Sequence, residues 1–377
     1  MQYAPTAEQQ EFGRTIRAFL ERRAPESGLP AVAAGTERFD RDLWQEMANQ
    51  LELLGIAVPE ELGGSGFGSV ERGLVVEEFG RALVPAPFFA SAVLALPMIL
   101  AAGQNASANH HVRDIIGGRS IACAALAESG RSAEATPTAY VAPNGELNGT
   151  KTVVMDGDLA DLFVVSALDT SGNTALYVVA AAAPGVSVHP QTMMDPTRGG
   201  AEVRFTGAAV DHLVTSEAAD RVIADVLVRA RIDLAFEQLG GAQRCLEIAV
   251  EHAKNREQFG RPIGSFQAVK HMCAQVQYDI EAARSAAWYA AWAVDASSAE
   301  LPTVAYTAKY LCSEAYLGAA RTCVHVLGGI GYTWEHPAQL FFKRATSDAQ
   351  FLGSPGDELN RLADRILGPP TALGQRV

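Results

Sequence analysis

The stretch NREQFGRPIGSFQAVKH, residues 255–271, ends one helical pattern and begins another. Three helix-breaking residues mark the turn between the two helices: Gly260, Pro262 and Gly264. Arg256 and Arg261 flank that turn, and Ser265 is a natural N-cap for the second helix. Two guanidinium groups beside a helix N-terminus suit a diphosphate group, and Gln267 can reach a ribose or base edge. The alternative is an ordinary charged turn between two helices.

A second stretch, HVLGGIGYTWEH at residues 325–336, is rich in glycine. Gly328 and Gly329 end a helix, and Gly331 follows them. Glycine lets the backbone approach a ligand closely, because it has no Cβ and tolerates positive φ. The pattern therefore predicts either helix termination alone or a backbone surface that contacts a ligand.

Helical patterns fill the chain around these stretches, apart from one β-rich region. We predict an N-terminal helical domain over residues 1–117, in which Asp40 caps a helix, and a middle β-domain over 118–215. Residues 216–377 are predicted to form a four-helix bundle. Its helices are expected at 216–254, 265–297, 302–327 and 357–367.

The middle region contains short apolar runs of strand length, which begin at Ile121, Asp161, Ala175 and Ala201. Asn144-Gly145 and Asn148-Gly149 are tight-turn signals beside them. Several short strands at regular spacing predict a small β-barrel or sandwich. The expected fold class is therefore mainly α with a central β-barrel.

The composition of the chain excludes several classes of binding partner and metal site. The formal net charge of the 377 residues is -13, and so acidic a surface repels nucleic acid and anionic membranes. The five cysteines have no CxxC spacing, which predicts small buried residues in a reducing cytoplasm rather than a metal site or disulfides. Residues 1–22 lack the apolar core of a secretory signal, and the apolar stretch 90–102 is shorter than a bilayer span.

The arginine and glycine stretches together closely resemble the C-terminal signature of the acyl-CoA dehydrogenase family. Three further segments fit that family in order, so that the likeness covers nearly the whole chain: PEELGGSG at 59–66, LNGTKT at 147–152 and GGAQRCL at 240–246. The resemblance implies non-covalently bound FAD and the oxidation of an acyl-CoA thioester to a 2-enoyl-CoA. It also implies a dimer of dimers and an acceptor such as electron-transfer flavoprotein.

The resemblance carries roles over to particular residues. Arg256 and Phe259 would contact the diphosphate and adenosine end of FAD, together with Gln267. The segment from His325 through Gly328 and Gly329 would reach the FAD of a neighbouring subunit. Gly353 and Ser354 would lie near the flavin.

The family's carboxylate base is missing from both expected positions. Leu352 stands where most members have a glutamate, and Ala230 stands where others place it. Asp233 and Glu237 follow one and two turns later on the same helix, and the alternative for both is an ordinary surface carboxylate.

The segments expected near the flavin ring depart from the family as well. The flavin loop is shortened to Ala127–Ser132, Val153 replaces an aromatic residue, and His325 replaces a glutamine.

The sequence leaves three functions open. A flavin monooxygenase on the same fold is a fourth, but no residue of the sequence favours it. In the first, the chain is one subunit of a heteromeric acyl-CoA dehydrogenase and completes the FAD site of a base-bearing partner. Actinobacterial relatives of this kind often handle bulky CoA esters such as steroid side chains. Alternatively, it is an active homo-oligomer with an unusual base such as Asp233, or a non-catalytic acyl-CoA-binding subunit.

Overall fold

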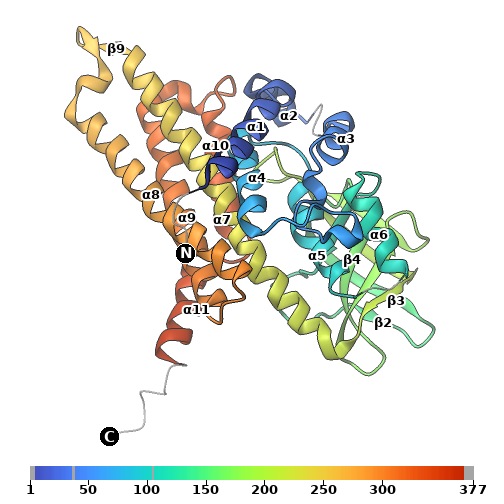
Figure 1. Cartoon of the computed structure of the whole chain (residues 1–377). Helices are drawn as coiled ribbons and strands as arrows, with labels where there is room; N and C mark the ends of the chain where they lie inside the picture. The colour runs from blue at the N-terminus through green and yellow to red at the C-terminus, as the bar shows by residue number, and fades with distance from the viewer. Residues whose placement is uncertain (1–4, 36–38, 104–105, 369–377) are drawn as a thin grey trace, which may run out of the picture. The chain divides into compact units, whose positions relative to one another are not determined.

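The computed structural model describes residues 5–35, 39–103 and 106–368 (Figure 1). Its internal contacts divide the chain into two compact units. Unit 1 comprises Met1–Ala33, Ser69–Val84 and Arg231–Val377, and unit 2 comprises Ala34–Gly68 and Pro85–Ala230. The division into three domains expected from the sequence remains a prediction.

Unit 1 is helical. Its helical segments are α1 (Ala7–Arg23), η1 (Glu26–Gly28), α2 (Leu29–Ala33), α4 (Ser69–Ala82), the part of α7 (Ser216–Asn255) from Arg231 onward, α8 (Gln267–Asp295), α9 (Leu301–Leu327), α10 (Ala338–Gln350) and α11 (Pro355–Leu367). Alanines line the buried faces of α8 and α9, and their short side chains let these two long helices pack closely. The long helices match the sequence prediction, whereas α10 was not predicted.

Unit 2 combines short helices with a sheet and the start of α7. Its helical segments are α3 (Arg41–Asn49), η2 (Leu53–Gly55), η3 (Glu60–Leu62), η4 (Phe89–Ala95), α5 (Leu96–Leu100) and α6 (Ala106–Ile116). Asp40 caps α3 as predicted, because its carboxylate accepts hydrogen bonds from the backbone N–H groups of Asp42 and Leu43. The apolar stretch 90–102 forms most of the buried η4 and all of α5.

Among its described residues, unit 2 has one mixed sheet of eight strands. They are β1 (Ala122–Ala125), β2 (Tyr140–Val141), β3 (Glu146–Met155), β4 (Leu162–Leu168), β5 (Thr174–Ala180), β6 (Val186–Pro190), β7 (Gly200–Ala209) and β8 (Asp211–Val214). Their order is β6-β7-β3-β2-β4-β5-β8, with β1 parallel to β4. The pairings establish a mixed sheet, and its closure into a barrel remains a prediction.

One of the two predicted turns is wrong. Asn144-Gly145 forms a turn before β3, with the Gly145 N–H donating to the Ala142 carbonyl. Asn148-Gly149 instead lies inside β3, where Gly149 is paired with Phe205 of β7. The register of this pair is irregular next to Asn148, and a local irregularity in a strand uses the same residue types as a turn.

The remaining composition-based predictions concern membranes and cysteines. Within residues 5–35, 39–103 and 106–368, no helix has the length and apolarity to cross a membrane. Four cysteines are buried, as predicted, whereas Cys273 is half-buried.

Candidate functional site

The arginine stretch forms a hairpin at the junction of α7 and α8 (Figure 1). Strands β9 (Glu257–Gln258) and β10 (Arg261–Pro262) pair antiparallel, and Phe259 and Gly260 turn the chain with φ of 55° and 75°. The Phe259 side chain is 91% exposed and packs edge-on against the Phe266 ring, with 6.1 Å between the centroids. An exposed aromatic residue in a strained turn is well placed to contact another molecule.

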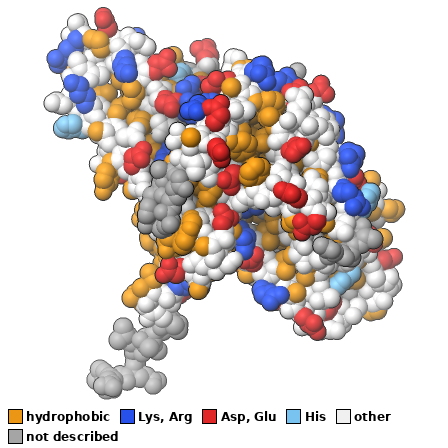
Figure 2. Space-filling model, viewed as in Figure 1, with side chains coloured by type: hydrophobic (Ala, Val, Ile, Leu, Met, Phe, Trp, Pro, Cys, Tyr) orange, Lys and Arg blue, Asp and Glu red, His pale blue; other side chains and the backbone are white. Residues whose placement is uncertain are grey.

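Basic side chains gather at this hairpin, although the molecule is acidic overall (Figure 2). Exposed cations there are Lys254, Arg256, Arg261 and Lys270. The Arg261 guanidinium lies 4.1 Å from the centroid of the Phe266 ring, which holds it in place. Within the described part of the chain, the Arg256 guanidinium has no ion-pair partner. It is therefore available to an anion such as a diphosphate.

The start of α8 differs from the prediction in one detail. The helix begins at Gln267, and Phe266, not Ser265, is its N-cap residue, with no side-chain cap. Ser265 belongs to the short helix η5 (Ile263–Ser265), and its buried hydroxyl has no hydrogen-bond partner among the described residues. Gln267 is exposed at the first position of α8, next to the hairpin.

The glycine stretch lies at the C-terminal end of α9. Gly328 ends the helix with φ of 66°, and His325 is exposed in its last turn. A Cβ added at Gly328 or Gly329 would meet no atom within 4 Å. The backbone is therefore open to close approach. It leads into the short helix η6 (Gly328–Tyr332), where Tyr332 is 71% exposed.

Leu352 occupies the first expected base position, between α10 and α11. It is half-buried and has φ of 62°, a left-handed conformation that is uncommon for leucine. Gly353 follows with φ of 121°. The Ser354 hydroxyl caps α11, since it accepts a hydrogen bond from the Asp357 N–H at 3.2 Å and donates one to the Asp357 carboxylate at 2.7 Å. Ser354 is thus already committed to a helix cap.

Ala230, at the second expected base position, is fully buried on α7. The two carboxylates that follow it are buried too, so their interpretation as surface residues is wrong. Asp233 is 2% exposed and accepts hydrogen bonds from Arg72 at 2.8 and 2.9 Å. Glu237 is 3% exposed and accepts one from Arg344 at 2.6 Å. Both carboxylates are held as ion pairs inside unit 1.

Glu358 is a buried carboxylate that the sequence analysis missed. It is fully buried in the first turn of α11, and its Oε1 lies 3.2 Å from Nε of Arg231, the residue after Ala230. A Cβ added at Gly353 would overlap the same oxygen, so Glu358 lies against the backbone beside Leu352. Burial raises the pKa of Glu358, although Arg231 opposes the shift. In the sequence, a glutamate here is indistinguishable from one that stabilises a helix N-terminus.

The shortened loop of unit 2 is anchored by Glu128. Its carboxylate accepts hydrogen bonds from the Ala139 N–H at 3.0 Å and from Lys151 Nζ at 2.8 Å, and two more from Thr138. Lys151 is fully buried, so the pair is structural. Val153 is 54% exposed with φ of 52°, and it presents only a small apolar surface where the family has an aromatic ring.

These residues fit one end of FAD better than the other. The hairpin offers exposed guanidinium groups, and the glycine stretch offers open backbone, both of which suit a diphosphate. The positions expected beside the reacting carbons are apolar, at Leu352 and Ala230. The hairpin and the glycine stretch thus each offer groups that suit a diphosphate, whereas neither expected base position carries a proton acceptor.

Comparisons with known proteins agree with this pattern. The family model "Acyl-CoA dehydrogenase, C-terminal domain" matches residues 221–367, and "Acyl-CoA dehydrogenase, N-terminal domain" matches residues 6–119. Acyl-CoA dehydrogenase IpdE2 of Mycobacterium tuberculosis is 35% identical over 366 residues, covering 97% of this chain and 99% of that protein.

Two solved structures share the fold over nearly their whole length. The ChsE4-ChsE5 complex from Mycobacterium tuberculosis matches with a TM-score of 0.88 and 30% identity, covering 98% of this chain and 100% of that chain. The Tcur3481-Tcur3483 steroid ACAD matches with a TM-score of 0.84 and 31% identity, covering 96% and 98%.

Proposed function

Because this chain belongs to the acyl-CoA dehydrogenase family, we propose that it is the base-lacking subunit of a two-component acyl-CoA dehydrogenase. The family's enzymes are oxidoreductases that act on the CH–CH group of acyl-CoA. In the proposed assembly, this chain completes the FAD site of a base-bearing partner. The observation that carries the proposal is that the chain has an exposed, cationic hairpin but apolar residues at both base positions, Leu352 and Ala230.

The chemistry explains why the missing base matters. Dehydrogenation removes a proton from the α-carbon and a hydride from the β-carbon, and FAD, when bound, accepts the hydride. The proton needs a positioned acceptor, which neither leucine nor alanine provides. Asp233 and Glu237 are held by Arg72 and Arg344 inside unit 1. The partner would therefore supply the acceptor, while Arg256, Phe259 and the glycine stretch of this chain bind the cofactor.

The relatives support a two-component assembly and a bulky substrate. The ChsE4-ChsE5 structure is described as a complex, and the Tcur3481-Tcur3483 enzyme is described as a steroid ACAD. We therefore propose a CoA ester of a steroid degradation product as the substrate class. We further propose that two heterodimers form the assembly, and that a protein such as electron-transfer flavoprotein accepts its electrons.

The test compares this chain purified alone with the same chain co-expressed with a base-bearing family member. Flavin per subunit and acyl-CoA-dependent dye reduction are measured for both. We expect activity only in the co-expressed complex. Normal activity of the chain alone would contradict the proposal, and colourless protein that still binds acyl-CoA would support a non-catalytic binding subunit instead.

The second candidate function is a homo-oligomer that is active alone, and Glu358 is the observation that favours it. This carboxylate is buried next to Leu352, and burial raises its pKa although Arg231 lies 3.2 Å away and opposes the shift. If the chain alone is active, Glu358→Gln should abolish turnover while flavin stays bound. The matched variant Asp233→Asn tests the base suggested by the sequence. Turnover that survives both changes would exclude both carboxylates.

A further inference from the structure

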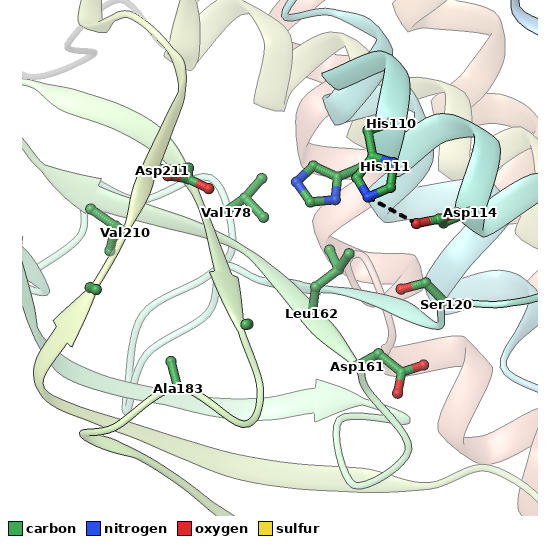
Figure 3. Close-up of a pocket in the computed structure, with 12 residues that line it drawn as sticks. His110, His111, Asp114, Ser120, Asp161, Leu162, Val178, Ala183, Val210 and Asp211 are labelled. Carbon is green, nitrogen blue, oxygen red and sulfur yellow. Dashed lines mark ion pairs between the residues drawn. The ribbon is translucent and has the colours of Figure 1, made fainter. Parts of the chain in front are cut away.

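A pocket of about 430 Å³ in unit 2 contains none of the residues of the candidate functional site (Figure 3). Its walls come from α6, from the start of β4, from β5 and from the turn between β7 and β8. His110 and His111 project into it from α6, and Asp211 faces them from β8. The volume lies within the range of about 300–1,000 Å³ that is usual for small-molecule sites.

The lining of this pocket includes no lysine or arginine, and its acidic side chains are Asp114, Asp161 and Asp211. Asp114 pairs with Arg119 at 2.8 Å and with Nε2 of His110 at 3.3 Å, and the Asp161 carboxylate accepts the Ile121 N–H at 2.8 Å. Within the described residues, the Asp211 carboxylate has no hydrogen-bond or ion-pair partner. The pocket therefore holds one carboxylate that is unused and another that is only partly used.

His111 does not cancel this negative charge at neutral pH. Burial lowers the pKa of His111, and the neighbouring His110 lowers it further, whereas Asp211 and Asp114 act in the opposite direction. His111 is therefore neutral at pH 7, since an ordinary histidine is already mostly neutral there. An anionic ligand would meet Asp161 and Asp211 with no lysine or arginine in the lining to compensate their charge.

The rest of the lining is apolar and small. Leu162 and Val178 are buried, and three alanines leave room beside them: Ala180, Ala183 and Ala209. Within the described residues, no group of three or more metal-ligating side chains could hold a metal ion. A ligand for this pocket thus needs a positive charge that is not a metal ion, and an aliphatic part to cover the apolar wall.

We propose that this pocket binds a small organic cation, a primary amine or guanidinium on a short aliphatic stem. The cationic group pairs with Asp211, and the stem packs on Leu162 and Val178. This site is independent of the proposed dehydrogenase function, so either can fail without the other.

Titration calorimetry of the full chain, in whatever complex it forms, tests the proposal with agmatine and cadaverine. Phosphate buffer is used, because Tris is itself an amine. We expect binding of at least one of the two amines, and none of pentane-1,5-diol, which has the cadaverine stem without its charges. No binding of either amine up to about 10 mM, or equal binding of the diol, would overturn the proposal.

Two variants locate the binding. Asp211→Asn removes the unpaired charge and should weaken amine binding at least about tenfold. Asp220→Asn, which changes an exposed carboxylate of α7 outside the pocket, should leave it unchanged. Asp161→Asn serves as a second test, since an asparagine oxygen can still accept the Ile121 N–H. Unaltered affinity in both pocket variants would show that the amine binds elsewhere and would refute the proposal.

Discussion

Val153 has a backbone conformation that β-branched residues rarely adopt. Its φ of 52° lies in the left-handed region, and its side chain is 54% exposed. Strain of this kind costs about 1–3 kcal/mol. The Val153 side chain is too exposed for its burial to offset that cost fully. Val153 lies within an irregularity of the β3–β7 register, between Lys151 and Val154. At this position, the backbone of β3 therefore has a left-handed conformation that a residue such as asparagine or glycine adopts more easily than valine.

Replacement of Val153 by Asn should stabilise unit 2, because asparagine tolerates the left-handed region. We expect the free energy of unfolding in urea to rise by about 1 kcal/mol. The matched control is Val186→Asn on β6, where φ is not positive, and it should give no gain. A loss of stability in Val153→Asn would show that the valine side chain contributes more than its backbone costs.

The Glu128–Lys151 pair makes the stability of unit 2 depend on pH. Burial acts to raise the pKa of Glu128, but hydrogen bonds from Ala139, Lys151 and Thr138 outweigh it and hold the pKa at about 2. A carboxyl whose folded pKa is lowered stabilises the protein fully above its unfolded pKa of about 4.3. That contribution is lost as pH falls from there towards 2.

The variant Glu128→Gln should lower the free energy of unfolding by about 3–5 kcal/mol at pH 7, since it leaves Lys151 buried without a charge partner. The difference from the natural chain should shrink as pH falls from about 4.3 towards 2. Urea titrations across this range measure it. The double variant with Lys151→Met should recover much of the loss. A difference that is independent of pH would argue against the ion pair as its cause.

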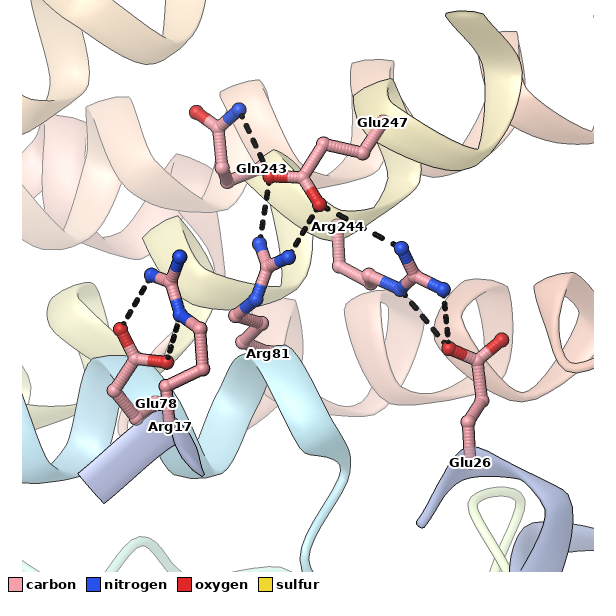
Figure 4. A network of polar contacts seen from close by, with 7 residues as sticks. All are labelled: Arg17, Glu26, Glu78, Arg81, Gln243, Arg244 and Glu247. Atoms are coloured by element: carbon pink, nitrogen blue, oxygen red, sulfur yellow. Dashed lines mark hydrogen bonds and ion pairs between the residues drawn. The ribbon is translucent and has the colours of Figure 1, made fainter. Parts of the chain in front are cut away.

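At the scale of elements, α4 and α7 cross with their backbones in close contact. A Cβ on Gly240 would overlap the Glu77 carbonyl of α4, and a Cβ on Gly80 would overlap the Glu237 carbonyl of α7. Ion pairs surround the crossing and link α1, η1, α4 and α7 (Figure 4): Arg17 with Glu78, Arg81 with Glu247, and Arg244 with Glu26. The glycines set the distance between the helices, and the ion pairs depend on it.

Gly240→Ala should therefore separate the two helices and lower the free energy of unfolding by about 3 kcal/mol. Gly318→Ala is the matched control, because Gly318 lies within α9 and an added Cβ there meets no atom within 4 Å. That change should raise stability by about 0.5–1 kcal/mol through helix propensity. Thermal melts of both variants test the contrast, and equal melting temperatures would show that the crossing has room for a methyl group.

At the scale of the whole molecule, charge is distributed unevenly. The chain carries a formal net charge of -13, yet exposed cations gather at the hairpin between α7 and α8 (Figure 2). A local cluster of this kind can attract an anionic cofactor that the rest of the surface repels. Arg256 is one of these cations, and its guanidinium has no ion-pair partner among the described residues.

Arg256→Gln should weaken flavin binding by the assembled complex at least about tenfold, while leaving the fold intact. Flavin retained after gel filtration and a fluorescence titration of the stripped protein measure the effect. Arg14→Gln, which removes an exposed arginine of α1 paired with Glu11, serves as the control. Flavin affinity equal to that of the control would remove Arg256 from the cofactor site.

Local features of this chain were predictable because neighbouring residues encode them. The three longest helices, the turn at Gly260, the helix end at Gly328 and the cap at Asp40 each depend on a few adjacent residues. Propensity and capping act over one or two turns, and so they can be recognised in sequence. The identity of Leu352 and Ala230, and hence the missing base, also required no structure.

Tertiary structure decided what depends on distant partners. Asp233 and Glu237 are buried because Arg72 and Arg344 neutralise them, and these arginines lie more than 100 positions away in the sequence. Glu358 is set apart from an ordinary helix carboxylate only by its contact with Arg231 and the backbone near Gly353. A charged side chain enters the interior only when a partner meets it there. The sequence identifies the residues, but only the fold determines which pairs meet.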